Sequence, residues 1–239
     1  MEMEHFTRQT RSLRDELERA RPFAVIAELK RSSPSAGALR MNVRCPDVAR
    51  EYESNGAAAV SVLTDERFFS GSLEDLHAVR GSVGLPLLRK DFIIHEYQIA
   101  EAKAYGADAV LLIAAILERS QLHELFIAAS ETGLECLIEL YDESEIDILD
   151  LDRMKLIGIN NRDLRTFTID VGRSIAMAGK LPDDATVVSE SGIRTPDHLR
   201  RLRDAGIRAA LIGEYFMSAD HPGQALNNLL RDFDNEPSR

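Results

Sequence analysis

The feature that most constrains the fold is a repeat of roughly 25 residues, in which a short apolar segment precedes a longer amphipathic one. Eight such apolar segments, rich in β-branched residues, occur along the chain, and this unit length is typical of a strand followed by a helix. The predicted strands are 23–29, 58–63, 86–91, 108–113, 134–140, 155–160, 185–190 and 209–213. Eight strand–helix units predict an α/β protein with a closed (β/α)8 barrel, the TIM-barrel fold.

The domain organisation follows from the segments between these strands. Helical patterns occur at 46–56, 72–81, 96–107, 119–133, 142–150, 195–206 and 221–230. A doubly wound open sheet is the main alternative fold, but no Gly-rich nucleotide-binding segment follows the first predicted strand. No linker or change of composition divides the 239 residues. We therefore expect a single barrel domain over 23–239, preceded by a short N-terminal helical extension over 1–22.

Charge and apolar content exclude several classes of protein. The chain has 40 acidic and 29 basic residues and a net charge of −11, whereas nucleic acids and anionic membranes attract a positive surface. The longest apolar run, 109–117, is about half as long as a membrane helix, and the charged segment 1–20 is not a signal peptide. Two cysteines are too few for a disulfide framework. We predict a cytoplasmic protein that binds neither nucleic acid nor membranes.

Polar residues end most of the predicted strands. In a parallel barrel the carboxyl ends of the strands meet at one face, where active sites lie. Each charged residue there could belong to a structural ion pair, but a group from six strands favours an active site, because buried charge is costly unless it is used or paired. The polar residues at these strand ends are Glu28, Lys30, Lys90, Glu139, Asn160, Arg162, Glu190, Ser191 and Glu214.

The last two strand ends indicate a phosphate site. In barrels, the loops after the seventh and eighth strands often present backbone N–H groups to a phosphate. Here these loops begin with Ser191-Gly192 and Gly213-Glu214, and glycine lets a ligand approach the backbone closely. The Glu214 carboxylate would repel a phosphate, so we assign only the backbone of this residue to binding.

Other motifs limit the chemistry. The histidines lack the spacing of metal ligands, so no metal site is expected. Ser35 and Ser191 have no histidine at a strand end to serve as their base, which argues against a hydrolase triad. The loop over 31–45 is long and rich in Ser, Gly and Pro, as lids and ligand-binding loops are. Phe69 suits either the core or a planar ligand, and the sequence leaves both open.

Eight segments, in this order along the chain, resemble the indole-3-glycerol-phosphate synthase family of tryptophan biosynthesis. They are VIAELKRSSPSAG (25–37), SVLTDERFFSGS (61–72), LLRKDFIIHEYQI (87–99), GADAVLLI (106–113), LIELYDESE (137–145), GINNRDLRTF (158–167), VSESGI (188–193) and ALIGEYFM (210–217). The resemblance, from Phe23 to the C-terminal helix, implies a (β/α)8 barrel with an N-terminal extension that helps close the site. It also implies a lyase reaction without cofactor or metal: ring closure of 1-(2-carboxyphenylamino)-1-deoxyribulose 5-phosphate to indole-3-glycerol phosphate, with loss of CO₂ and water.

The resemblance implies roles for five catalytic residues. Lys90 resembles the general acid that protonates the ribulose carbonyl oxygen, and Glu139 resembles the acid–base group of the dehydration. Glu28 and Asn160 resemble groups that orient the sugar hydroxyls and the catalytic side chains. Lys30 resembles the lysine that contacts the substrate carboxylate.

The resemblance also implies residues that bind the substrate. Those around the phosphate and the polar chain are Ser33, Arg162, Ser191, Gly192, Gly213 and the backbone of Glu214. Phe69 is placed beside the anthranilate ring, and Glu190 matches the glutamate that precedes Ser-Gly in the family. Because a small anionic sugar phosphate needs local cations, Lys30, Lys90 and Arg162 supply them, and we expect the neighbouring cations to lower the pKa of Lys90.

Two other functions remain open from the residues. A sugar-phosphate isomerase could use the same barrel, although isomerases of this type use Cys/Asp or Asp/Asp pairs where this chain has Lys90 and Glu139. A non-catalytic phosphate-binding barrel would keep the glycines and would be expected to lose these two side chains. We expect a monomer, with weak association with neighbouring pathway enzymes as the alternative.

Overall fold

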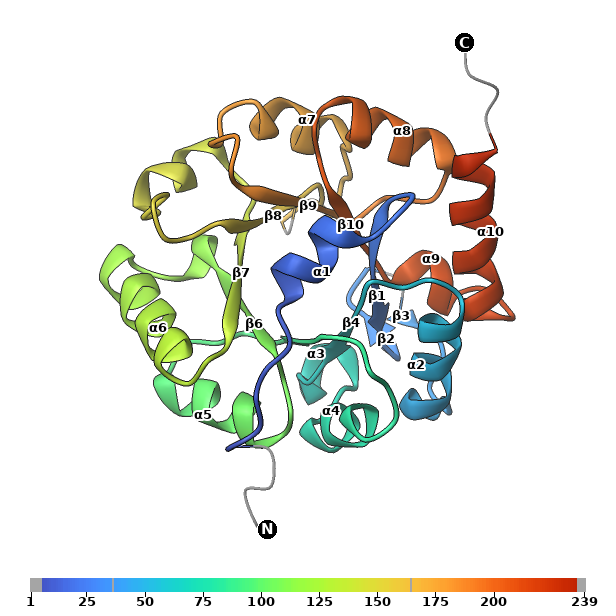
Figure 1. Cartoon of the computed structure of the whole chain (residues 1–239), viewed down its shortest axis with the longest axis horizontal. Coiled ribbons are helices and arrows are strands. Elements are labelled where there is room, and N and C mark those ends of the chain that lie inside the picture. The colour runs from blue at the N-terminus through green and yellow to red at the C-terminus, as the bar shows by residue number, and fades with distance from the viewer. Residues whose placement is uncertain (1–5, 36, 164, 236–239) are drawn as a thin grey trace.

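The chain forms a closed barrel of eight parallel strands surrounded by helices (Figure 1). The computed structural model describes residues 6–35, 37–163 and 165–235. The start of the predicted extension, 1–5, and the end of the predicted barrel domain, 236–239, therefore lie outside the described residues. The barrel strands are β1 (Ala24–Leu29), β4 (Ala59–Leu63), β5 (Leu87–Lys90), β6 (Ala109–Ile113), β7 (Glu135–Leu140), β8 (Leu156–Asn160), β9 (Thr186–Glu190) and β10 (Ala209–Ile212). Because β10 pairs with β1, with Ala209 opposite Ala24, the predicted (β/α)8 barrel is confirmed and the open sheet is excluded.

Helices follow the strands on the outside of the barrel. They are α2 (Cys45–Ser54), α4 (Leu73–Arg80), α5 (Glu96–Ala104), α6 (Arg119–Glu131), α7 (Gly172–Ala178), α8 (Pro196–Asp204) and α10 (Pro222–Asp234). The predicted helix over 142–150 is instead a short 3₁₀ helix, η2 (Glu143–Ile148), and the sequence did not predict α7. Short helices also follow β4, β6 and β10: α3 (Glu66–Phe69), η1 (Ala114–Ile116) and α9 (Glu214–Met217).

The strands are buried on both faces, since alternate residues point toward the helices and toward the barrel interior. In β1, Val25 and Ala27 pack in the outer core with the helices, whereas Ala24 and Ile26 pack inside the barrel. Glu28 continues the interior series at the C-terminal end of the strand. The same alternation brings polar interior residues of other strands to this end, which determines where a site can form.

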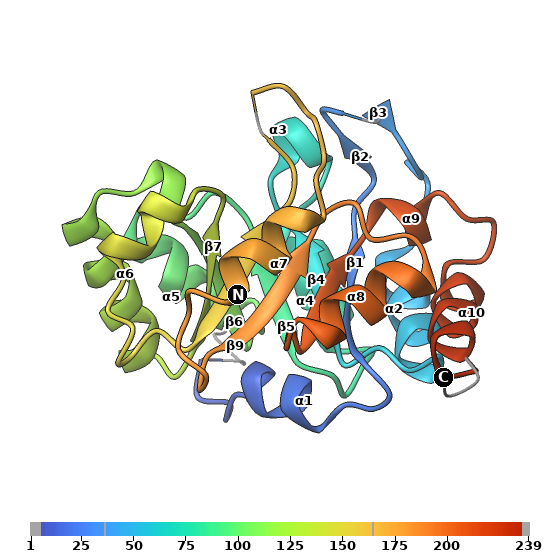
Figure 2. The ribbon, with the colours of Figure 1, turned by 90° about the horizontal axis from the view of Figure 1, so that it is seen from above.

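The helix before the first strand, α1 (Leu13–Arg19), lies across the N-terminal end of the barrel (Figure 2). Leu13 and Leu17 are almost completely buried among interior residues of the strands. Arg14 donates to the hydroxyl of Thr186, the first residue of β9. This helix therefore covers the end of the barrel opposite the carboxyl ends of the strands, so α1 does not take part in closing a site there.

A buried ion cluster attaches the segment before α1 to the barrel. Asp108, just before β6, has 0% exposure, and its carboxylate accepts from Arg8 at 2.7 Å and from Arg80 at 2.8 Å. The amides of Arg11 and Leu87 also donate to it. These donors compensate for the burial of charge, so the cluster stabilises the attachment of the N-terminal segment.

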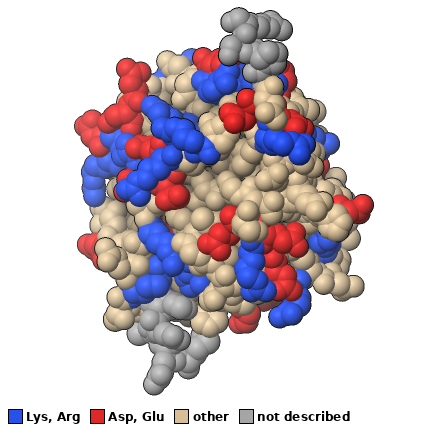
Figure 3. Space-filling view, turned by 45° about the vertical axis from the view of Figure 1, so that its right-hand side comes forward, with Lys and Arg blue, Asp and Glu red and all other residues tan. Residues whose placement is uncertain are grey.

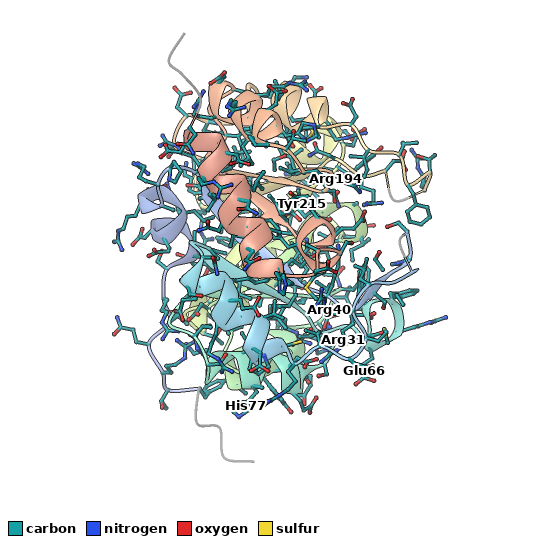
Figure 4. The ribbon with its side chains drawn as sticks, turned by 90° about the vertical axis from the view of Figure 1, so that its right-hand side faces the viewer. Arg31, Arg40, Glu66, His77, Arg194 and Tyr215 are labelled. Atoms are coloured by element: carbon teal, nitrogen blue, oxygen red, sulfur yellow. The ribbon has the colours of Figure 1, made fainter. Side chains whose placement is uncertain are left out.

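The long loop over 31–45 begins at the C-terminal end of β1, and Arg31 and Arg40 hold it on its two sides (Figure 4). It contains a short antiparallel pair, β2 (Ser32–Ser33) and β3 (Gly37–Ala38). Arg31 forms a two-point ion pair with Asp75, and Arg40 donates to the carbonyl oxygen of Ala219. The base of the loop is thereby held against the helices around the mouth of the barrel.

The outer surface carries charges of both signs. Acidic and basic side chains are interspersed on the face shown in Figure 3, so the net charge of −11 is not concentrated in one patch of that face. In the described part of the chain, no helix combines the length and the apolar character needed to cross a membrane.

Candidate active site

A cavity of about 410 Å³ opens at the C-terminal ends of the strands. Its lining includes every residue that the sequence predicts for the site: Glu28, Lys30, Ser33, Phe69, Lys90, Glu139, Asn160, Arg162, Glu190, Ser191, Gly192, Gly213 and Glu214. The volume is within the usual range for a small organic ligand. The structure therefore brings the predicted residues together at one place.

Four charged side chains form the uppermost layer of the barrel interior. Interior layers of such barrels contain four side chains from alternate strands. Here the four strands are β1, β5, β7 and β9, and the side chains are Glu28, Lys90, Glu139 and Glu190. Apolar interior residues lie two positions before each of them, so the layer rests on the core of the barrel.

Lys90 is the only cation within this layer of described residues, and it contacts all three carboxylates. Its Nζ lies 2.6 Å from Glu190 Oε2, 3.6 Å from Glu139 Oε2 and 3.8 Å from Glu28 Oε2. Glu28 also accepts an ion pair from Lys30, whose Nζ lies 2.9 Å from Glu28 Oε1. The layer can therefore hold and exchange protons among groups that are already in contact.

The prediction of a lowered pKa for Lys90 is wrong. Burial alone would lower the pKa of Lys90, but Glu190, Glu139 and Glu28 together raise it well above its ordinary value. The prediction assumed that Lys30 and Arg162 are the charges that act on Lys90, whereas the nearest charges are carboxylates from other strands. Lys90 is therefore an ammonium group throughout the neutral pH range.

The carboxyl groups of the layer differ in their proton affinity. Burial raises the pKa of Glu190 to about 8, although Lys90 opposes this shift. Burial also acts to raise the pKa of Glu28, but Lys30 and Lys90 outweigh it, and the pKa of Glu28 is lowered. Neighbouring carboxyls with pKa values moved in opposite directions are typical of acid–base sites.

Two glycines make room for these carboxylates. A Cβ at Gly158, in β8, would overlap Glu190 Oε1, and a Cβ at Gly213 would overlap Glu28 Oε1. Any larger residue would push the carboxylate out of its place beside Lys90. Gly213 therefore has a second role besides the one predicted for it, and Gly158 is a site residue that the sequence analysis missed.

The loops after β9 and β10 form a polar end of the cavity. Ser191 and Gly192 are consecutive left-handed residues, with φ of 68° and 79°. The Glu214 carboxylate lies between two guanidinium groups, 3.0 Å from Arg162 and 2.6 Å from Arg194. In Figure 4, Arg194, after β9, is labelled next to Tyr215, which follows Glu214 after β10. Arg162 is thus paired with Glu214, and Arg194 is a second cation at this position that was not predicted from the sequence.

Aromatic side chains from the loops after β4 and β5 line another part of the cavity. Phe69 and Phe92 have ring centroids 6.4 Å apart, and Phe68 meets Phe92 edge-on at 6.1 Å. Phe69 is half-buried in the cavity wall, so the reading of this residue as core is excluded. Phe92 was missed, although it directly follows Asp91 in the segment that carries Lys90.

The remaining predicted residues support this arrangement. Asn160, at the end of β8, accepts a hydrogen bond from the amide of Arg162 through its Oδ1 at 3.0 Å, and the residue lines the cavity. Ser33 and Ser35, in the loop over 31–45, have hydroxyl oxygens 3.4 Å apart and line the cavity with Pro34. The long loop therefore contributes to the ligand site, as the sequence predicts.

The structure is a TIM barrel in which one ammonium group meets three carboxylates at the carboxyl ends of the strands. The sequence matches the family model described as indole-3-glycerol phosphate synthase over residues 1–229. It is 49% identical over 207 residues to the indole-3-glycerol phosphate synthase of Bacteroides thetaiotaomicron, covering 87% of this chain and 79% of that one. The enzyme of the same name from Salinibacter ruber is 47% identical, covering 87% and 78%. The chain belongs to the indole-3-glycerol phosphate synthase family.

Solved structures of other proteins share the fold. Thiamine phosphate pyrophosphorylase from Pyrococcus furiosus aligns with a TM-score of 0.67 and 15% identity, covering 93% of this chain and 98% of that one. Tryptophan synthase subunit alpha from Legionella pneumophila aligns with a TM-score of 0.67 and 12% identity, covering 94% and 97%. At these identities the likeness concerns the fold alone.

Proposed function

We propose that this chain catalyses the reaction for which its family is named, converting 1-(2-carboxyphenylamino)-1-deoxyribulose 5-phosphate to indole-3-glycerol phosphate, CO₂ and water. The observation that carries the proposal is the contact of Lys90 with three carboxylates in one cavity. The reaction needs protons delivered and removed at neighbouring atoms, and a buried layer of this composition can do both.

The substrate has three parts, and we propose one region of the cavity for each. The phosphate binds the Ser191-Gly192 turn and the backbone of Gly213 and Glu214, with guanidinium groups close by. The anthranilate ring lies against Phe69 and its aromatic neighbours. Its carboxylate is assigned to Lys30, because Lys90 is surrounded by carboxylates already.

The first step forms the carbon–carbon bond. The ring carbon that bears the carboxylate attacks the ribulose carbonyl carbon, and negative charge develops on the carbonyl oxygen. Lys90 is charged and desolvated, so it stabilises this oxygen and donates a proton to it. The raised pKa makes Lys90 a weak acid toward the carbonyl but an adequate acid toward the alkoxide that forms.

The later steps restore the aromatic ring. The bond from the ring carbon to its carboxylate breaks, CO₂ departs and the electron pair returns to the ring system. Loss of water then needs a proton delivered to the new hydroxyl group and a proton removed from the adjacent carbon. We assign this exchange to Glu139, whose carboxylate lies 3.6 Å from Lys90 and can pass protons through it.

Other residues hold the reacting groups in place. Glu28 is ionised and paired with both lysines, so it fixes their positions. Asn160 has an amino group available for a sugar hydroxyl. Glu190, with its raised pKa, holds Lys90 from the opposite side of the barrel. Because these contacts already hold the side chains in place, less conformational entropy is lost when the transition state forms.

The proposal is tested by adding the substrate to the purified protein and following indole fluorescence. A rise in fluorescence with stoichiometric release of CO₂ is expected. Binding of the substrate without either signal would identify a non-catalytic phosphate-binding barrel instead. The cytoplasmic location, the monomeric state, the binding of phosphate and the independence from cofactor and metal stay predictions.

A further inference from the structure

One polar side chain next to the site is fully buried and has no part in the reaction proposed above. Asn161 follows the last residue of β8 and has 0% exposure. Its amino group donates to Ser189 Oγ at 3.0 Å and to the carbonyl oxygen of Ser191 at 3.1 Å. Its Oδ1 accepts from the amide and the hydroxyl of Ser174, at 3.1 and 2.8 Å. Every hydrogen-bonding position of this side-chain amide is thus occupied.

The network determines the orientation of the side chain. The amide N–H of Ser174, near the start of α7, can only donate, so the group that it meets is the Asn161 oxygen. The amino group must then face Ser189 and Ser191. Since Ser174 and Ser189 also have 0% exposure and lie 2.7 Å apart through their hydroxyls, the whole network is shielded from water.

The contact with Ser191 controls the direction of one peptide group in the cavity wall. In a trans peptide the C=O and the following N–H point in opposite directions. Because the Ser191 carbonyl points inward to Asn161, the Gly192 N–H points the other way. Gly192 lines the cavity, and its N–H has no hydrogen-bond partner within the residues that the structure describes.

The turn needs this support because its backbone is unusual. Ser191 has a φ of 68°, a region that residues with a side chain seldom adopt, and Gly192 follows with 79°. The backbone amide of Asn161 adds a hydrogen bond to the carbonyl of Glu190 at 2.9 Å. Asn161 therefore holds the carbonyl oxygens of two consecutive peptide groups, Glu190–Ser191 and Ser191–Gly192.

We propose that Asn161 is a positioning residue for substrate binding, because it orients the Ser191–Gly192 peptide so that the Gly192 N–H is presented to the substrate phosphate. This inference rests on the proposed phosphate position. Asn161 acts through the turn and does not contact the substrate, so its loss changes binding more than the chemical steps.

The test compares Asn161→Ala with the native protein. We expect about a ten-fold rise in KM and in the inhibition constant of inorganic phosphate, as for loss of one buried hydrogen bond, with kcat changed less than about two-fold. Asn161→Asp is the second variant, since it keeps the acceptor for Ser174 but places an oxygen against the Ser191 carbonyl. It should weaken phosphate binding at least as much. Both variants are assayed well below their unfolding temperatures.

Ser174→Ala is the matched control. It removes a hydroxyl from the same buried network but leaves the contact between Asn161 and Ser191, so it should lower the unfolding temperature with little change in KM. Equal changes in KM for Ser174→Ala and Asn161→Ala would overturn the inference, as would native phosphate affinity in both Asn161 variants. If phosphate does not compete with substrate even in the native protein, the proposed phosphate position fails instead.

Discussion

Lys90 and Glu190 form an ion pair of 2.6 Å across the barrel, between strands that lie opposite each other in the ring. The strands β5 and β9 are separated by three strands on either side. Glu28 and Glu139 come from the strands midway between them, so all four charged side chains belong to one layer of the barrel. The ammonium group of Lys90 is therefore held by groups on three sides, and its position depends on the closure of the barrel.

Replacement of Lys90 tests the assignment of the general acid. Lys90→Met removes the ammonium but keeps a flexible side chain of similar length, and we expect kcat to fall by about 10³-fold or more while the far-UV circular dichroism stays native. Lys180→Met, at an exposed lysine outside the cavity, should keep full activity. A Lys90→Met protein with near-native kcat would exclude Lys90 as the acid.

Replacement of Glu190 tests its proton affinity. In the unfolded chain this carboxyl ionises near pH 4.5, and in the folded protein near pH 8. Between these values the folded state binds more protons than the unfolded state, so the contribution of Glu190 to stability is full below pH 4.5 and is lost as the pH rises through 8. The amide in Glu190→Gln does not titrate. The free energy of unfolding of this variant, relative to that of the native protein, should therefore increase by a few kcal/mol between pH 4.5 and pH 8.

The measurement is denaturant unfolding of both proteins at several pH values. Above the folded-state pKa the difference between them should stay constant. Activity is expected to fall in Glu190→Gln even where its stability exceeds the native value, since the amide of the variant cannot take up and release a proton beside Lys90 as the carboxyl group can. A stability difference that does not vary with pH would show that the pKa of Glu190 is not raised.

Glu214 offers a test of the polar end of the cavity. Its carboxylate neutralises Arg162 and Arg194, so Glu214→Gln should free both for an anion. The binding of inorganic phosphate should become about three-fold stronger, which corresponds to less than about 1 kcal/mol for partly exposed charges. Calorimetric titration at low and high salt measures this, and the gain should shrink at high salt. Glu143→Gln, paired with Lys180 outside the cavity, should leave the affinity unchanged. Weaker binding in Glu214→Gln would mean that Glu214 orients the guanidinium groups.

The ion cluster at the other end of the barrel should affect stability alone. Asp108→Asn leaves the buried Arg80 without its charged partner, so the free energy of unfolding should fall by about 3 kcal/mol. Because the cluster lies at the N-terminal end, kcat and KM of the folded fraction should be native. Asp184→Asn, at an exposed carboxylate paired with Lys155, should leave the free energy of unfolding almost unchanged, because solvent screens this pair. Loss of kcat in Asp108→Asn would show that the two ends are coupled.

The fold was predictable because each strand is a continuous apolar segment, and the site because polar residues interrupt these segments at their ends. Glu139, for example, is the one charged residue among apolar neighbours in the segment 136–140. The helix α7 was not predictable in this way, since the loop before it has no apolar period and α7 is short. Contacts with residues outside α7 determine where this helix begins.

The electrostatics of Lys90 was not predictable from the sequence. Its nearest charges come from residues about 50 to 100 positions away, and their distances depend on the order of strands around the ring. The position of α1 was missed for a related reason. The two leucines that bury this helix have their partners in strands spread over the whole chain.

The position of α1 across the N-terminal end of the barrel affects how substrate enters and how products leave. Leu13 and Leu17 fill the N-terminal end of the barrel, so whatever enters or leaves the cavity passes the loops at the mouth. Carbon dioxide, water and indole-3-glycerol phosphate then depart along the route by which the next substrate arrives. Substrate cannot bind until the product has left by the same route, so slow release of the product delays the next catalytic cycle.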